Sequence, residues 1–209
     1  MVRQPSERRA HAKAELREKI LSAARVLFAR RGYEAVTMRE IGRKIGYTAT
    51  ALYYHFPDKA ALLLELCETD FRALSDYFKS LGGIADPVER IRQTSRAYVN
   101  FGLEYPQHYR FMFMTPRPQP PPESVRIEQG NPDQDAYAFL LNAVEEAIAA
   151  KRFRPELKDA QLIAQAVWGA VHGVVALHLT KCDEGWVEWR TAERTAALLG
   201  ECFLRGVLR

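Results

Sequence analysis

Residues 37–57, TMREIGRKIGYTATALYYHFP, contain residues that typically start and end helices. Their order predicts two short helices separated by a tight turn. Thr37 and Glu40 have the Thr-x-x-Glu spacing of a capping box, which predicts a helix start. Gly46 accepts the left-handed conformation that ends a helix. Thr48 then caps a second helix, and Pro57 stops it because the residue before a proline avoids helical geometry. The stretch predicts a helix-turn-helix.

Helical periodicity continues on both sides of this stretch. Apolar residues between Leu16 and Phe28 predict an amphipathic helix of about four turns that stops at Gly32. Asp58 is expected to cap a long helix that reaches Gly82. Further helices are predicted over 86–105, from Pro106 to about 114, and over 133–151, 159–180 and 187–207, with a proline-rich loop at 116–132. The fold class is therefore all-α with about nine helices: a three-helix domain that contains the helix-turn-helix in residues 1–60 and a helical body in residues 61–209.

Charge is divided unevenly along the chain. Residues 1–60 carry 13 Lys and Arg against 6 Asp and Glu, whereas the remaining residues carry 17 against 20. A basic N-terminal region on a mildly acidic body indicates contact with a polyanion, the alternative being a solvated basic face.

Several classes of protein and site are disfavoured by the sequence. Three distant cysteines without a CxxC pair indicate reduced thiols in a cytoplasm. His172 and His178 lie on different faces of a helix, so no metal site is expected. We expect no membrane span, no secretory signal and no cofactor. GxSxG, P-loop, HExxH and GxGxxG motifs are missing from the sequence, so an enzyme is not expected.

Residues 16–63 resemble the DNA-binding domain of the TetR family of bacterial transcription repressors. The resemblance lies in AARVLFARRGYEAVTMREIG, in the turn Gly46-Tyr47-Thr48 and in LYYHFPDKAALL. Tyr47 and Thr50 depart from the family pattern, in which a small aliphatic residue and a glycine are common, so the operator of a relative does not transfer. The resemblance implies a repressor that binds double-stranded DNA at a palindromic operator as a homodimer.

The stretch YTATALYYHF gathers hydroxyls, methyls and rings, with no formal charge before Asp58. A helix that enters the major groove needs such groups and no carboxylates. By resemblance, DNA contacts fall on three sets of residues: phosphate contacts at Thr37, Arg39 and Lys59, base contacts at Thr48, Ala49 and Thr50, and backbone contacts at Tyr53 and Tyr54. His55 contacts DNA or packs beside Phe56. The alternatives are a half-buried Tyr53 and an Arg39 that serves only as an ion-pair partner.

The body contains a second motif. AQAVWGAVHGVVAL (residues 164–177) and FGLEYPQHYRFMF (residues 101–113) resemble the Trp-Gly and His-Gly element of one TetR subgroup. Gly169 and Gly173 permit close approach of another helix. Aromatic residues suit a pocket for a small hydrophobic effector or, alternatively, an ordinary core: Phe101, Tyr105, Tyr109, Phe113, Tyr137, Trp168 and His172. The resemblance implies release from DNA by such an effector and a dimer interface on the last two helices. The alternative hypotheses are a DNA-binding regulator without a small-molecule ligand and a helical enzyme.

Overall fold

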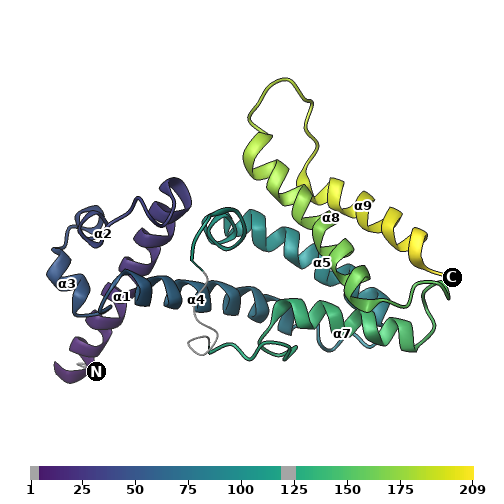
Figure 1. Ribbon diagram of the computed structural model, residues 1–209, viewed down its shortest axis with the longest axis horizontal. Helices are drawn as coiled ribbons and strands as arrows, with labels where there is room; N and C mark the ends of the chain where they lie inside the picture. Colours follow the sequence, from purple (N-terminus) through teal and green to yellow (C-terminus); the bar gives the residue numbers. More distant parts are fainter. Residues whose placement is uncertain (1–4, 119–125) are drawn as a thin grey trace. The chain divides into compact units, whose positions relative to one another are not determined.

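A computed structural model describes residues 5–118 and 126–209, and these residues confirm the all-α prediction (Figure 1). Their only β feature is an isolated bridge between Phe153 and Leu208. The chain divides into two compact units, each described separately below. Unit 1 comprises residues up to Asp70 together with Gln107–Arg126, and unit 2 comprises Phe71–Pro106 together with Ile127–Arg209.

Unit 1 holds the predicted helix-turn-helix. Its elements are α1 (Pro5–Arg31), α2 (Met38–Ile45), α3 (Ala49–Tyr53), the first part of α4 (Lys59–Lys79), most of α6 (Pro106–Tyr109) and the π-helix η1 (Arg110–Met114). Apolar faces of these helices meet in one core that includes Ile20, Phe28, Ile41, Leu52, Phe56, Leu66 and Phe111. The core leaves the outer surfaces of α2 and α3 uncovered.

The boundaries of several helices differ from the predictions. Helix α1 starts at Pro5, well before Leu16, because residues 7–15 are good helix formers without an apolar period. Helix α3 ends at Tyr53, and the amides of His55 and Phe56 both donate to the carbonyl of Leu52 in a tight turn. The last helix starts at Ala192 rather than near residue 187, since the Thr191 side chain caps it there. Residues 119–125 of the predicted loop lie outside the described residues.

A buried ion pair joins α1 to α4 inside unit 1. The Arg25 guanidinium donates from Nε and Nη2 to the Asp70 carboxylate at 2.7–3.0 Å. The Asp70 side chain is fully buried and that of Arg25 is 9% exposed. His108 of α6 places its Nδ1 3.0 Å from the same carboxylate. One carboxylate thus joins α1 to α4 and lies close to α6.

Unit 2 is built from the end of α4, α5 (Pro87–Glu104), α7 (Ala136–Ala149), α8 (Ala160–Lys181) and α9 (Ala192–Val207). Asp86, Asp135, Asp159 and Thr191 cap the N-termini of α5, α7, α8 and α9 with their side chains. Helices α5, α7, α8 and α9 share a core that includes Val88, Ile91, Leu140, Val144, Ile163, Val167 and Leu204. Figure 1 shows α8 and α9 lying side by side, joined by a loop that extends past their ends.

Helix α8 is unusually apolar for a helix with so much open surface. Among the described residues it is the one helix whose length and composition alone would suit a membrane span, which the sequence analysis did not anticipate. Only 28% of its most apolar window is buried within the chain. Leu162 and Leu177 are 62% and 53% exposed, and Ala166 and Gly169 between them are also exposed. The described residues of the chain therefore leave an apolar face of α8 uncovered.

Candidate nucleic-acid interface and ligand site

The start of α2 is organised by the predicted capping box. The Thr37 hydroxyl accepts from the amide of Glu40, and both the amide and the hydroxyl of Thr37 donate to the Glu40 carboxylate at 2.9 Å. Arg31 donates to the same carboxylate at 2.9 Å. This hydrogen bond from Arg31, followed by those from Thr37, lowers the pKa of Glu40 to about 2. The one hydroxyl proton of Thr37 is therefore engaged by Glu40, whereas Arg39 is exposed.

Two glycines shape the turn between α2 and α3. Gly46 has φ +77° and ends α2 in the left-handed conformation, as predicted. Gly42 was not singled out by the sequence, yet it is buried, and a Cβ there would lie 2.6 Å from the carbonyl oxygen of Tyr47. The amide of Tyr47 also donates to the Gly42 carbonyl at 2.9 Å. The turn therefore folds directly onto α2 and fixes the direction in which α3 leaves.

Helix α3 presents the residues that the sequence predicted to contact DNA. The Thr48 hydroxyl accepts from the amide of Ala51 and keeps its own proton for an external acceptor. Thr50 is exposed, Ala49 is half-buried, and Tyr53 and Tyr54 are 51% and 74% exposed. Leu52 points into the core with no exposure. The outer face of α3 thus carries hydroxyls, a methyl and phenol rings, with no carboxylate.

The surface beside α3 is basic. Arg39, Arg43 and Lys44 of α2 are exposed. His55, just after α3, has its pKa lowered by burial first and then by the nearby charges of Lys13 and Arg17. Its backbone carbonyl accepts from Arg17 at 3.0 Å, so this loop is fixed by α1. His55 is half-buried next to Phe56, whose ring is covered by the Arg17 guanidinium at 4.3 Å.

Lys59 at the start of α4 has a structural role that the sequence did not reveal. Its ammonium donates to the carbonyls of Tyr33 and Val36 at 3.0 and 3.2 Å and lies 4.1 Å from the centre of the Tyr33 ring. An ammonium has three protons, so one remains for a phosphate oxygen. Lys59 therefore ties the loop between α1 and α2 to α4, and its phosphate contact stays a prediction.

The predicted ligand-binding residues fall into separate groups. In unit 2, the Trp168 indole donates to the Tyr98 hydroxyl at 3.0 Å, and that hydroxyl lies 3.2 Å from Nδ1 of His172. Tyr137 packs beside Trp168 with ring centres 5.9 Å apart, and its hydroxyl donates to Gln161. Burial lowers the pKa of His172, which favours its neutral form. These residues form a cluster of aromatic rings around one shared hydroxyl.

The remaining predicted residues form two other ring pairs, one in each unit. Phe101 is buried against Tyr105, with ring centres 5.3 Å apart, and Tyr105 is 37% exposed. Along α5, Tyr98 and Phe101 are three residues apart and share one face. Tyr109 and Phe113 belong to unit 1, where their ring centres are 5.0 Å apart and Tyr109 is fully buried.

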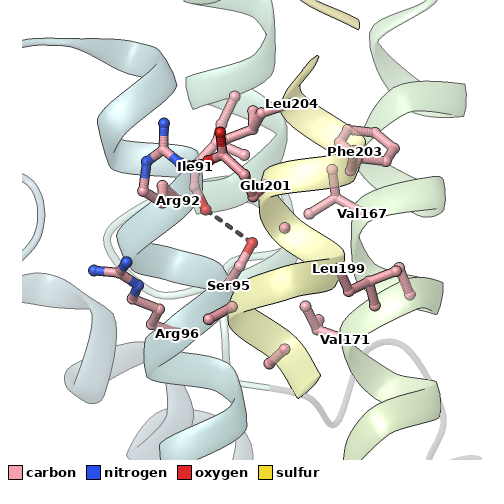
Figure 2. Close-up of a pocket in the computed structure, with 14 residues that line it drawn as sticks. Ile91, Arg92, Ser95, Arg96, Val167, Val171, Leu199, Glu201, Phe203 and Leu204 are labelled. Atoms are coloured by element: carbon pink, nitrogen blue, oxygen red, sulfur yellow. Dashed lines mark hydrogen bonds and ion pairs between the residues drawn. The ribbon is translucent and has the colours of Figure 1, made fainter. Parts of the chain in front are cut away.

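A small cavity of about 60 Å³ opens between α5, α8 and α9 (Figure 2). Its walls are mainly apolar, with Val167, Val171 and Leu204 among them, and Arg92 and Glu201 form an ion pair at 3.0 Å beside it. Pockets for drug-sized ligands span about 300–1,000 Å³, so this cavity is too small for one. It contains none of the predicted ligand-binding residues. Within residues 5–118 and 126–209, no group of three or more metal-ligating side chains is found.

Two groups of functional interest escaped the sequence analysis. Lys13 and Arg17 lie on α1 yet contact Tyr54 and His55 at the end of α3. The only sequence signal is that Lys13 and Arg17 are four residues apart and precede Ile20 by seven and three residues, which places all three on one face of α1. Tyr98 contacts both Trp168 and His172, which are 70 and 74 residues away from it in the sequence. Its buried position on the apolar face of α5 was the available signal, because a buried phenol normally finds a hydrogen-bond partner.

Comparison with known proteins identifies the class. Residues 20–66 match the profile described as "Bacterial regulatory proteins, tetR family", and residues 91–199 match "Tetracyclin repressor-like, C-terminal domain". The second match alone covers more than half of the chain. The chain therefore belongs to the TetR family of bacterial regulatory proteins, a family of transcriptional regulators. The finer resemblance to the Trp-Gly and His-Gly subgroup is not named by either match and stays a prediction.

Individual relatives agree with this assignment. The chain is 33% identical over 82 residues to the transcriptional repressor KstR of Rhodococcus jostii, covering 39% of this chain and 38% of KstR. It is 28% identical over 141 residues to the transcriptional activator FasR of Mycolicibacterium smegmatis, covering 67% of this chain and 64% of FasR. The alignments with these curated relatives thus span less than two thirds of their length.

Solved structures share the fold over nearly the whole chain. A TetR family regulator from Marinobacter aquaeolei matches with a TM-score of 0.73 at 22% identity, covering 97% of this chain and 98% of that one. PfmR, a TetR family regulator from Thermus thermophilus, matches with a TM-score of 0.72 at 24% identity, covering 91% and 99%. At these identities the likeness establishes the fold.

Proposed function

We propose that the protein is a cytoplasmic transcriptional repressor that binds a palindromic DNA operator as a homodimer and releases it when a small hydrophobic effector binds. The observation that carries this proposal is the outer face of α3. That face has exposed hydroxyls and phenols, no carboxylate, and basic residues of α2 beside it. A face of this composition matches what base edges and phosphates accept.

The proposed DNA contacts are of two kinds: contacts with bases, which recognise the sequence, and contacts with the backbone, which position the protein. Thr48, Ala49 and Thr50 are short enough to reach base edges at the start of α3, while Tyr53 and Tyr54 reach the sugar-phosphate backbone. Arg39 and the third proton of Lys59 serve phosphates. Thr37 would reach a phosphate only by exchanging its present contact with Glu40. His55 supports the loop after α3 rather than contacting bases.

The dimer is assigned to α8 and α9. The apolar face of α8 runs through Leu162, Ala166, Gly169 and Leu177, and Leu198 of α9 is 68% exposed. Among the described residues, apart from the nearby backbone of α8 itself, no atom lies within 4 Å of a Cβ built at Gly169 or Gly173, so the space beside these glycines is open. A second copy that packs its own α8 and α9 against this face buries it by two-fold symmetry. The same packing accounts for an apolar α8 without a membrane.

Substitution of Gly169 tests the dimer. Gly169→Arg places a charge in the proposed interface and should convert a dimer into a monomer by light scattering at micromolar concentration. Gly83→Arg is the matched control, because Gly83 is also exposed, has open space around it and lies outside α8 and α9. A wild-type monomer in the presence and absence of DNA contradicts the proposal, and so does a Gly169→Arg protein that stays dimeric.

The effector site is assigned to the cluster around Tyr98. Aromatic rings supply apolar contact, and the hydroxyl shared by Trp168 and His172 supplies one polar anchor. An effector releases DNA only if it binds the non-binding arrangement of the dimer more tightly, and a coupling of about 1–3 kcal/mol lowers operator affinity about 5- to 150-fold.

Thermal-shift screening with hydrophobic compounds tests the effector. A compound that stabilises the wild type and releases DNA should act less on Tyr98→Phe, while the DNA affinity of that variant without compound stays unchanged. If no compound shifts the wild type, a regulator without a small-molecule ligand is the better description. FasR is named an activator, so transcription of a reporter should also be measured, and a rise on binding contradicts repression.

A further inference from the structure

The N-terminal part of α1 has a basic face that continues beyond the core of unit 1. At 100° per residue, Arg9 and Arg17 lie about 40° to either side of Lys13 around the helix, and Ile20 and Ala24 lie within about 20° of it. Ile20 and Ala24 are buried in the core of unit 1. The face of α1 that packs the core therefore turns basic as the helix leaves it.

Acidic residues avoid this face. Glu7, Glu15 and Glu18 lie about 120–160° from Lys13 around the helix. His11 pairs with Glu15 at 3.3 Å on that far side. Within the segment Pro5–Glu15, Arg9 and Lys13 thus lie toward the core side, whereas both carboxylates and Arg8 lie away from it.

The basic face of α1 contacts the residues at the end of α3. The Lys13 ammonium lies 5.1 Å from the centre of the Tyr54 ring, and Arg17 donates to the His55 carbonyl. Arg17 also pairs with Glu65 at 2.9 Å, so its charge is satisfied within the protein. Arg9 and Lys13 are both exposed, and within the described residues neither guanidinium nor ammonium has a carboxylate partner. Arg9 lies about 6 Å further along the axis than Lys13.

We propose that Arg9 and Lys13 bind DNA phosphates beyond those reached from α3, so that the DNA-binding surface extends along the first turns of α1. The inference rests on the proposed function, because Tyr54 is one of the residues assigned to the backbone of the same DNA. Lys13, beside the Tyr54 ring, would bind the next phosphate along the DNA, and Arg9 would bind one further along, about one turn of α1 away. Both contacts are electrostatic and independent of sequence.

Charge-matched variants test the inference. Arg9→Ala/Lys13→Ala and Arg8→Ala/Lys19→Ala each remove two exposed cations from α1, but Arg8 and Lys19 lie about 120–140° from Lys13. Binding to a random-sequence duplex of about 30 base pairs is measured by fluorescence anisotropy between 50 and 200 mM KCl. The first pair should reduce the slope of log K against log salt by about 1.8 for each bound subunit. The control pair should leave the slope near the wild-type value.

The outcomes separate this inference from the proposed function. Equal reductions in both variants mean that only net charge matters, and no reduction in either means that α1 does not reach DNA; each result overturns the inference alone. No binding by the wild type overturns the proposed function and the inference with it. Arg9→Lys/Lys13→Arg should keep the wild-type slope, which confirms that charge on this face is the cause. Circular dichroism at 222 nm checks that helix content is unchanged.

Discussion

Removal of the buried Asp70 carboxylate should strongly destabilise unit 1. Asp70→Ala leaves the Arg25 guanidinium, whose side chain is only 9% exposed, without the partner that accepts its three hydrogen bonds. An uncompensated buried charge of this kind costs about 3–5 kcal/mol. Replacing both residues, as in Arg25→Met/Asp70→Leu, should cost much less, because the charge and its partner leave together.

Urea unfolding with two probes measures this effect. All three tryptophans, Trp168, Trp186 and Trp189, lie in unit 2, so their fluorescence reports that unit, whereas circular dichroism reports both units. With an m-value of about 2 kcal/mol/M, Asp70→Ala should lower the midpoint of the unit 1 transition by about 1.5–2.5 M. Glu15→Ala is the control within unit 1, since Glu15 is 59% exposed in its pair with His11 and should change stability by under about 1 kcal/mol. A loss of under 1 kcal/mol in Asp70→Ala, or a double variant as unstable as the single one, would refute the reasoning.

Three further predictions concern the turn, Lys59 and pH. Gly42→Ala should destabilise unit 1 by about 1–3 kcal/mol and weaken DNA binding, because its Cβ would meet the Tyr47 carbonyl at 2.6 Å, whereas Gly83→Ala, with open space, should be neutral in the same urea titration. Lys59→Met should lower the free energy of unfolding by about 1–3 kcal/mol, because two carbonyl contacts are lost, and should also reduce the salt dependence of DNA binding. A Lys59→Met protein as stable as the wild type would contradict the structural role of Lys59. Burial lowers the pKa of His172, so its contribution to stability is complete above the unfolded value of about 6.5 and declines as pH falls through that value toward the lower folded pKa. The melting temperature of His172→Gln should therefore fall less than that of the wild type between pH 7.5 and 5.5, and parallel curves would contradict this.

The helix-turn-helix was predictable because local residues determine it. Thr37 with Glu40, Gly46 and Thr48 each act on a backbone group within a few residues, and the capping box, the left-handed stop and the second cap all occur where the sequence placed them. The early start of α1 was missed because residues 7–15 are helical through their propensity alone, with no apolar period to reveal it.

The site was less predictable, because contacts between distant residues depend on packing. The exposure of Thr50, Tyr53 and Tyr54 follows from the short α3, whose buried side is Leu52. The engagement of Lys59 with two carbonyls joins residues more than 20 positions apart and has no local signal. Likewise, aromatic composition predicted a ligand pocket without showing that Tyr109 and Phe113 belong to unit 1 and Trp168 and His172 to unit 2, and the pocket itself stays a prediction.

Hydroxyl-radical footprinting of the DNA that flanks the coding region tests the central claim most directly. A dimer that inserts two copies of α3 into successive major grooves should protect two symmetric segments with centres about 34 Å apart. Thr50→Ala should weaken protection at this site while leaving binding to random DNA unchanged, since Thr50 is assigned to base edges. Absence of protection throughout the flanking DNA, a single unsymmetrical footprint, or equal loss of specific and random binding in Thr50→Ala would contradict a dimeric repressor that reads DNA through α3.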